Sequence, residues 1–306
     1  MLTAEDEGSS VVNDVVDEAG VPAEGTPAVS IVIPAHNEEA VLGANLATLL
    51  DGARPGEFDV VVVPNGCTDR TAEVAAAAGV RVVASPVGGK PNAIRLGDAV
   101  CRAFPRIYLD ADVTMSADSV RALVAACAAP GVLACAPVPE LDLGGVGQVA
   151  RRVHRVHERL IAPNRALAGV GAYVVTEAGH ARIFPMPDII SDDGWVHTSF
   201  APAERAVVAT ARTVVRPART VRAHLRRRVR VRAGNRELAQ LGRSHAGGRL
   251  RLSSLLGLVR RREVRLLDAG CYLGVLLAER ALTRHLRRGG TVAPAWGSDA
   301  TTRAAG

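Results

Sequence analysis

The feature that most constrains the fold of this chain is an alternation of short apolar runs with helical patterns. The run VSIVIPA, which starts at Val29, precedes leucines at helical spacing, and the run FDVVVVP, which starts at Phe58, precedes an alanine-rich segment. A third apolar run, RIYL, follows the helical stretch KPNAIRLGD. Strands and helices that alternate at this length form a mainly parallel sheet with helices on both faces. We therefore predict a Rossmann-like α/β domain.

Composition divides the chain into three parts. Residues 1–27 are acidic and weakly periodic, and no Lys or Arg occurs before Arg54, so we predict a disordered tail. Residues 28–238 contain the alternating pattern and form the predicted α/β domain. Residues 239–306 are rich in Arg and contain two apolar stretches, which predict a helical extension followed by a tail. These stretches fall short of the roughly 20 residues that a membrane-spanning helix needs, so they either pack on the domain or lie on a membrane surface.

Charge and cysteine content bear on the compartment and the partners. The net charge is +6, and the acidic start lacks the basic and apolar regions of a secretory signal peptide. The five cysteines are odd in number and form no CxxC pair, which favours reduced thiols. We therefore expect a cytoplasmic protein whose basic C-terminal part has the option of peripheral contact with the inner face of the membrane. Aromatics make up only 3% of the chain, so we expect no nucleic-acid partner that stacks bases.

Two carboxylates follow the apolar run RIYL, where a buried strand is expected to end. Asp110 and Asp112 therefore lie at the carboxyl end of a strand, which is where open α/β sheets bind ligands. Alternate side chains of an extended segment point the same way, so the two carboxylates can converge on one cation. Their oxygens suit Mg²⁺ or Mn²⁺. The alternative is a solvated strand end with two acidic caps.

The loop after the first predicted strand faces the same edge of the sheet. It runs from Pro34 to Glu39 and brings Ala35, His36 and Glu38 within reach of a ligand that lies across the strand ends. A plain helix start capped by Asn37 explains the same residues, and the two interpretations are compatible.

Lys90 is the only lysine in the chain, and it lies in the small-residue loop GGKPN. A compact, flexible cation in such a loop is suited to a phosphate group. The loop does not match the GxxxxGK[ST] pattern of a P-loop. A solvated loop lysine is the alternative.

The order of these segments resembles the family 2 glycosyltransferases of GT-A fold. The resemblance covers residues 29–238 and rests on the segments VSIVIPAHNEE, NGCTDRT, GGKPNAIRLGD, YLDAD, ISDDGWVH and RRRVRVRAGN. It implies an inverting enzyme that moves a sugar from a UDP-, GDP- or TDP-sugar to a hydroxyl of a glycan, a lipid-linked sugar or a small molecule. The pattern is most similar to bacterial enzymes of polysaccharide and cell-surface biosynthesis, whose tails often end in a pattern like WGSDATTR.

The resemblance also implies roles for the residues at the predicted edge. Asp110 and Asp112 would hold a divalent cation that bridges the two phosphates of the donor. The loop after the first strand would hold the base and ribose, through Pro34, Ala35, His36 and Glu38. Many relatives carry an Asp pair where this chain has Pro64 and Asn65, so Asn65 is left to hydrogen-bond the base or ribose.

The motif ISDDGWVH supplies the expected catalytic base. Inverting transfer needs a base that takes the proton of the acceptor hydroxyl while the nucleoside diphosphate leaves from the opposite face of the sugar. Asp193 lines up with the base of the family, and Asp192 beside it would orient the acceptor or shift the pKa of the base. A helix cap is the alternative for both. Arg227 and Arg230 lie in a basic motif that would clamp the diphosphate once its loop closes.

Two other functional classes remain open. A sugar nucleotidyltransferase would share the sheet and the metal but release pyrophosphate. A basic scaffold protein would keep its binding if Asp112 and Asp193 became Asn. The segment ISDDGWVH favours the transferase over both.

Two features outside the donor motifs have structural interpretations. His154 and His157 lie three residues apart on a predicted helix and are surrounded by arginines, which predicts a solvated helix face. Trp195 offers either a face for stacking on a sugar or a core side chain.

Overall fold

One eight-stranded sheet organises the molecule. The computed structural model describes residues 27–162, 165–243 and 252–288. The strands lie in the order β3-β2-β1-β4-β7-β6-β8-β5. Their bounds are β1 Val29–Ala35, β2 Phe58–Pro64, β3 Arg81–Val82, β4 Arg106–Leu109, β5 Val113–Met115, β6 Ala134–Leu141, β7 Ala172–Val175 and β8 Arg205–Val215.

The first half of the sheet follows the predicted βα alternation, and the second half does not. Strands β3, β2, β1 and β4 are parallel to one another. Strand β7 runs antiparallel to both β4 and β6, and β5 runs antiparallel to β8, while β6 and β8 are parallel. The sheet is therefore mixed, with its parallel part where the sequence pattern is clearest.

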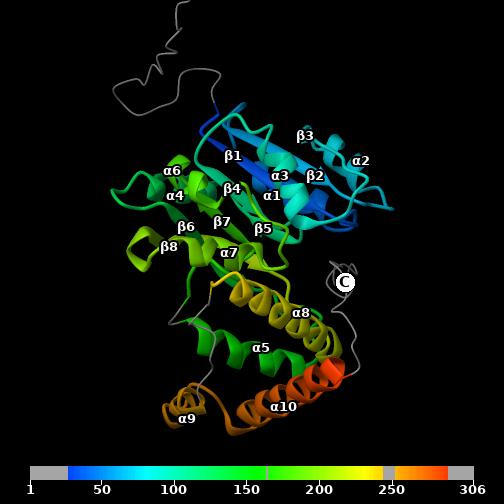
Figure 1. Ribbon diagram of the computed structural model, residues 1–306, viewed down its shortest axis with the longest axis vertical. Helices are drawn as coiled ribbons and strands as arrows, with labels where there is room; N and C mark the ends of the chain where they lie inside the picture. The colour runs from blue at the N-terminus through cyan, green and yellow to red at the C-terminus, as the bar shows by residue number, and fades with distance from the viewer. Residues whose placement is uncertain (1–26, 163–164, 244–251, 289–306) are drawn as a thin grey trace, which may run out of the picture.

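Helices cover both faces of the sheet and extend beyond it (Figure 1). Their bounds are α1 Leu42–Leu50, α2 Thr71–Ala77, α3 Lys90–Asp98, α4 Ala117–Cys127, α5 Gln148–Ile161, α6 Glu177–Ile183, α7 Asp192–Ser199, α8 Val221–Gln240, α9 Leu252–Arg260 and α10 Leu266–Arg288, with a 3-10 turn at Pro202–Glu204. No helix in the described ranges is long and apolar enough to cross a membrane.

Alternation along the strands builds a core on each face of the sheet. On β1, Ile31 and Ile33 point to one side, where they pack with α1, α2 and α4. Val32 points to the other side, where it packs with Ile94 of α3 and with α6 and α7. The buried side chains are mainly Ala, Val, Leu and Ile, as the low aromatic content requires.

A third core joins the C-terminal helices to the domain. Side chains of α5, α9 and α10 form it, and partly buried residues of α8 pack against it. Figure 1 shows α5, α8 and α10 stacked beyond the sheet. Since α5 and α8 belong to the predicted residues 28–238, the described part of the extension shares its core with that domain. The predicted tail at residues 1–27, apart from Pro27, and the pattern WGSDATTR lie outside the described residues.

The predicted solvated face of α5 is wrong. His154 is buried, its Nε2 lies 2.9 Å from the Ala218 carbonyl oxygen, and its ring meets that of His224 edge-on. Burial lowers the pKa of His154, and it lowers those of His157 and His224 to about 3. The prediction failed because α8 and α10 cover this face of α5, which no local pattern shows.

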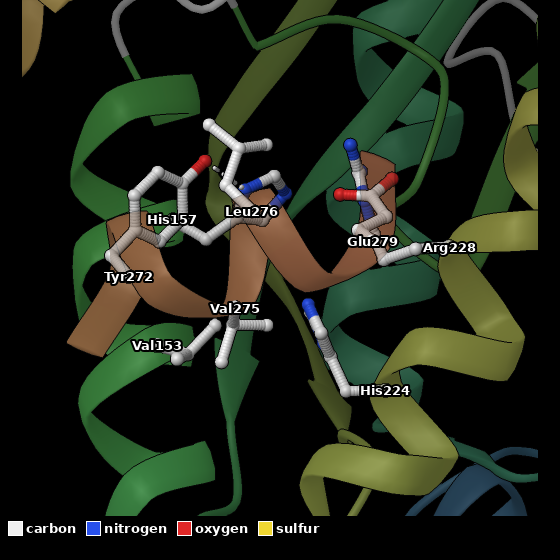
Figure 2. Close-up of a pocket in the computed structure, with 8 residues that line it drawn as sticks. All are labelled: Val153, His157, His224, Arg228, Tyr272, Val275, Leu276 and Glu279. Carbon is white, nitrogen blue, oxygen red and sulfur yellow. Dashed lines mark hydrogen bonds and ion pairs between the residues drawn. The ribbon is translucent and has the colours of Figure 1, made fainter. Parts of the chain in front are cut away.

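A small pocket between α5, α8 and α10 is closed by an ion-pair network (Figure 2). Glu279 of α10 is buried and its Oε1 accepts from Arg228 Nε at 3.2 Å and from Arg232 Nε at 2.7 Å, both on α8. His157 and Tyr272 lie side by side in the same pocket. These contacts fix α10 against α8, so we assign the pocket a structural role.

Candidate functional site

A cluster of one lysine and two carboxylates lies where three separate elements meet. Lys90 Nζ, at the start of α3, lies 2.6 Å from Asp110 Oδ1 and 3.0 Å from Asp192 Oδ2. Asp110 directly follows β4, and Asp192 is the first residue of α7. The residues are far apart in sequence, so the sheet brings together the side chains that the motifs singled out.

The turn that follows β4 is held in place by the backbone and by one buried side chain. The Asp110 N–H donates to the Gly171 carbonyl at 2.9 Å. Gly171 has a φ of 77°, and a Cβ there would lie 2.5 Å from a methyl group of Val113, so only glycine fits. Asn45 of α1, also buried, donates from Nδ2 to the Ala111 carbonyl at 2.7 Å. The backbone between the two candidate metal ligands is therefore fixed.

Lys90 is largely enclosed, with its side chain 19% exposed, so it is not the solvated loop lysine of the alternative interpretation. Burial alone would lower the pKa of its ammonium group. The charges of Asp110 and Asp192 outweigh that effect and raise the pKa above its usual value. Lys90 is therefore a cation at neutral pH.

Asp192 is the most deeply buried carboxylate of the cluster. Burial raises its pKa to about 6, although Lys90 acts in the opposite direction, and the charges of Asp193 and Asp110 add to the rise. The Tyr173 hydroxyl lies 3.5 Å from Asp192 Oδ2. Asp192 thus holds Lys90 through an ion pair. Burial of the Asp192 carboxylate disfavours its ionised form.

Asp193 is half-buried and its carboxylate is fixed by three donors. Oδ1 accepts from the Ser191 hydroxyl at 2.9 Å and from the Gly194 N–H at 2.7 Å. Oδ2 accepts from the Gly169 N–H at 2.7 Å. A carboxylate oxygen accepts about two hydrogen bonds, so Oδ2 keeps room for one more donor.

The first-strand loop is hydrogen-bonded to the loop after β2. Pro34, Ala35 and Glu38 are buried, and Ala35 presents only its backbone to this edge. His36 is partly exposed, and its Nδ1–H donates to the Asn65 carbonyl at 2.7 Å. Of the four predicted donor-loop residues, His36 is the one whose side chain is partly accessible.

The predicted contact of Asn65 with a base or ribose is not supported by its position. Its side chain is fully buried, with Nδ2 donating to the Ala35 carbonyl at 2.7 Å and Oδ1 accepting from the Gly89 N–H at 3.0 Å. Asn65 therefore positions the loop that carries Lys90. An amide at a strand end satisfies backbone groups as readily as a ligand, and the sequence alone does not distinguish the two uses.

The basic motif forms a continuous helix, so the expected closing loop at Arg227 and Arg230 is corrected. Both lie within α8, where Arg227 is exposed and Arg230 is partly buried. They precede Gly234 by two turns and one turn, and Gly234 packs against Ser191 at the start of α7. The two arginines thus lie on the helix that packs against the start of α7, which carries the predicted base.

The packing of α8 on α7 is a feature that sequence reasoning missed. Glu237 Oε2 accepts from the Ile190 N–H at 2.7 Å, and a Cβ on Gly234 would lie 2.9 Å from Ser191 Cβ. The Arg243 guanidinium lies 3.7 Å from the centre of the Trp195 ring and covers it, which favours the core interpretation of that tryptophan. A glycine within a helix was the available signal, because it marks a close approach.

The protein ligands present fit a cation whose coordination shell is completed by the substrate and by water. The described ranges contain no group of three or more His, Cys, Asp or Glu residues able to hold a metal. Asp110 and Asp112 supply carboxylate oxygens at one turn. Mg²⁺ and Mn²⁺ are commonly held in this way, by one or two carboxylates together with water and phosphate oxygens.

The sheet order, its helical layers and the acidic turn after β4 define a GT-A fold. Comparison with solved structures agrees. A mannosyltransferase from Pyrobaculum calidifontis is 16% identical, with a TM-score of 0.55 over 87% of this chain and 79% of that one. Glucosyl-3-phosphoglycerate synthase from Mycobacterium tuberculosis is 21% identical, with a TM-score of 0.52 over 73% of this chain and 82% of that one.

Sequence comparison indicates the same family. Residues 30–171, slightly less than half of the chain, match the family model described as glycosyl transferase family 2, so this segment is similar to that family. An uncharacterized glycosyltransferase of Mycobacterium tuberculosis is 38% identical over 98 residues. This alignment covers 32% of the present chain and 43% of the relative, so the chain spans less than half the length of that protein.

Proposed function

We propose that this protein transfers a sugar from a nucleotide-diphosphate donor to a hydroxyl acceptor with inversion at the anomeric carbon. The observation that carries the proposal is the cluster of Lys90, Asp110 and Asp192 at the carboxyl end of the parallel strands. Lys90 supplies one positive charge, and the carboxylates beside it can bind a divalent cation. Two positive charges at one edge of the sheet are suited to the diphosphate of such a donor. The proposal is supported by structural neighbours that were solved with GDP-Man and Mn²⁺ or with UDP-Glc and Mn²⁺.

Asp110 and Asp112 would hold the divalent cation, Mg²⁺ or Mn²⁺. When bound, it would offset the negative charge that develops on the departing nucleoside diphosphate. Lys90 lies against Asp110 and would contribute a fixed positive charge on the same side. Because Lys90 is charged at neutral pH and barely exposed, its contribution requires no reorganisation of solvent.

Asp193 is the proposed catalytic base. Its three hydrogen bonds hold the carboxylate in one orientation. Oδ2 has room to accept one more hydrogen bond, from the hydroxyl group of the sugar acceptor. Deprotonation of that hydroxyl at the moment of attack is general-base catalysis. Asp192 would act by holding Lys90 in place.

Further residues at this edge are proposed to contact the base, the ribose and the phosphates of the donor. The base and ribose would lie over the first-strand loop, with His36 as the accessible side chain and with backbone groups of Pro34, Ala35 and Glu38 as further contacts. Asn65 would act indirectly, by positioning the loop that carries Lys90. Arg227 and Arg230 would meet phosphate oxygens or an anionic acceptor from α8.

The acceptor is proposed only as a hydroxyl compound, whether a glycan, a lipid-linked sugar or a small molecule. The proposed location is the cytoplasm, with peripheral contact at the inner face of the membrane. A sugar nucleotidyltransferase remains the competing activity, because it would use the same sheet edge and metal.

The test is donor cleavage by the purified protein. UDP-, GDP- and TDP-sugars are incubated with Mn²⁺, with Mg²⁺ or with a chelator, and the nucleotide products are separated. We expect metal-dependent release of one nucleoside diphosphate by the wild type and by the matched control Asp118→Asn, whose carboxylate on α4 is 91% exposed. Asp112→Asn should lose this activity. A parallel assay with a sugar 1-phosphate and a nucleoside triphosphate tests the competing activity. Metal-dependent release of pyrophosphate in that assay, with no nucleoside diphosphate released from any donor, would replace the transferase with the nucleotidyltransferase.

A further inference from the structure

Four leucines on α9 and at the start of α10 are strongly exposed. Leu266 is 78% exposed and Leu267 is 62% exposed, and Leu252 and Leu256 on α9 are exposed by more than half. Single exposed leucines are common on soluble proteins, but a group of four within one short stretch marks a contact surface. We call these four leucines, with the arginines described below, the α9–α10 corner.

The exposed leucines are not part of the core that holds the two helices. Leu255 and Leu258 of α9 point inward and pack in the third core with Val264 and Ala269. Leu252 and Leu256 lie one turn apart, so they share a face of α9 that the third core does not cover. Helix α9 is thus apolar on two sides, of which one already has its packing partner.

Arginines surround the leucines of the corner. Arg260, Arg261, Arg262 and Arg265 are all exposed, and Glu263 is the only acidic residue between Leu252 and Leu267. Glu263 pairs with Arg261 at 2.6 Å. The stretch therefore carries a net charge of +3, from four arginines and one glutamate.

The position of the corner suits contact with an extended surface. In Figure 1 the turn between α9 and α10 lies at the lower end of the long axis of the molecule, beyond α5 and α8. The first-strand loop and the Lys90 cluster belong to the sheet and to the start of α7, not to α9 or α10. A surface that met the corner would leave the sheet free.

We propose that the α9–α10 corner docks on the surface of a lipid bilayer that carries anionic headgroups. The four leucines would enter the boundary between headgroups and acyl chains, and the arginines would lie at the level of the phosphates. Only the start of α10, at Leu266 and Leu267, would meet the bilayer, and the rest of the helix would lead away from it.

Charge argues against a second copy of this chain and against the two adjoining chain segments as occupants of the patch. A second copy of this chain docked on the same patch would bring +3 against +3, which is repulsive. Neither chain segment next to the described helices offers an acidic complement. Residues 244–251 add Arg249 and Arg251, and residues 289–306 contain one Asp and one Arg. An anionic lipid surface complements both the leucines and the arginines.

Vesicle co-sedimentation tests the proposal with the full chain. We expect binding to vesicles of phosphatidylcholine mixed with phosphatidylglycerol, weak binding to phosphatidylcholine alone, and weaker binding at high salt. The double variant Leu266→Ser with Leu267→Ser should bind at least about tenfold more weakly. Arg262→Gln and Arg265→Gln should each weaken binding by about fivefold. Leu277→Ser, at an equally exposed leucine further along α10, is the matched control and should bind like the wild type.

Equal binding by the wild type and the double leucine variant would overturn the proposal. So would a monomeric double variant if the wild type were a dimer by analytical ultracentrifugation, because the patch would then be a self-interface. The proposal does not depend on the transfer activity. Donor cleavage without lipid should be unchanged in the leucine variants, so failure to bind vesicles and failure to cleave donor are separate results.

Discussion

Replacing Asp192 by Asn removes one charge from the buried cluster while preserving the shape of the side chain. The wild-type carboxylate is only 4% exposed, and burial raises its pKa from 3.8 to about 6. The folded protein therefore binds this proton more tightly than the unfolded chain does. Asp192 contributes its full share of stability below pH 3.8, and that share is lost as the pH rises through about 6.

The expected effect follows from the size of the shift. A difference of about two pKa units corresponds to about 3 kcal/mol. At pH 7 the folded wild type holds Asp192 ionised against this penalty, whereas Asn carries no charge. We expect the free energy of unfolding of Asp192→Asn to exceed that of the wild type by about 3 kcal/mol at pH 7, with the difference falling towards zero near pH 4.

Urea unfolding followed by circular dichroism at several pH values between 4 and 7 measures this difference. Asp118→Asn, on the exposed face of α4, is the control and should differ from the wild type by the same small amount at every pH. The same Asp192→Asn protein should transfer sugar more slowly, because Lys90 loses one of its two partners. A stability difference that does not change with pH would refute the assignment of Asp192 as a buried, destabilised carboxylate.

Other substitutions test separate parts of the site. Asp193→Asn should lower kcat by at least about a hundredfold with little change in donor KM, as steady-state kinetics would show, and an unchanged kcat would rule it out as the base. Lys90→Met should destabilise the fold by about 3 kcal/mol in urea unfolding and raise donor KM, since the buried carboxylate of Asp192 loses its cation. Asn45→Ala should cost about 2 kcal/mol and weaken Mn²⁺ binding, because a buried carbonyl beside the acidic turn loses its donor. Gly234→Ala should lower kcat by displacing the start of α7, while Gly270→Ala, whose added methyl meets no atom within 4 Å, should leave kcat unchanged.

The parallel half of the sheet could be predicted because its signals are local. The apolar runs at β1, β2 and β4 give both the strands and their burial, and the polar residues that follow them fall at one edge of a parallel sheet. For the same reason Asp110 was expected at this edge, where it forms an ion pair with Lys90, which the sequence singled out only as a cation suited to a phosphate.

The second half of the molecule depends on contacts that local patterns do not contain. Nothing in the sequence of β7 says that it inserts antiparallel between β4 and β6. His154 lies among arginines in the sequence but against α8 in space. Asn65 has the same polar amide whether it faces a ligand or, as here, backbone groups of neighbouring loops. In each case the partner is distant in sequence, so the residue type alone leaves the outcome open.

The central claim is that the acidic turn after β4 holds a divalent cation together with a nucleoside diphosphate. Electron paramagnetic resonance measures it directly, because Mn²⁺ bound to protein loses the sharp signal of free Mn²⁺. We expect the wild type to bind Mn²⁺ tightly only when UDP, GDP or TDP is present, since the protein supplies two carboxylates and the phosphates supply the rest. Asp112→Asn should not bind the complex, and Asp118→Asn should bind it like the wild type. Equal binding by wild type and Asp112→Asn, or no binding with any of the three nucleotides, would contradict the claim.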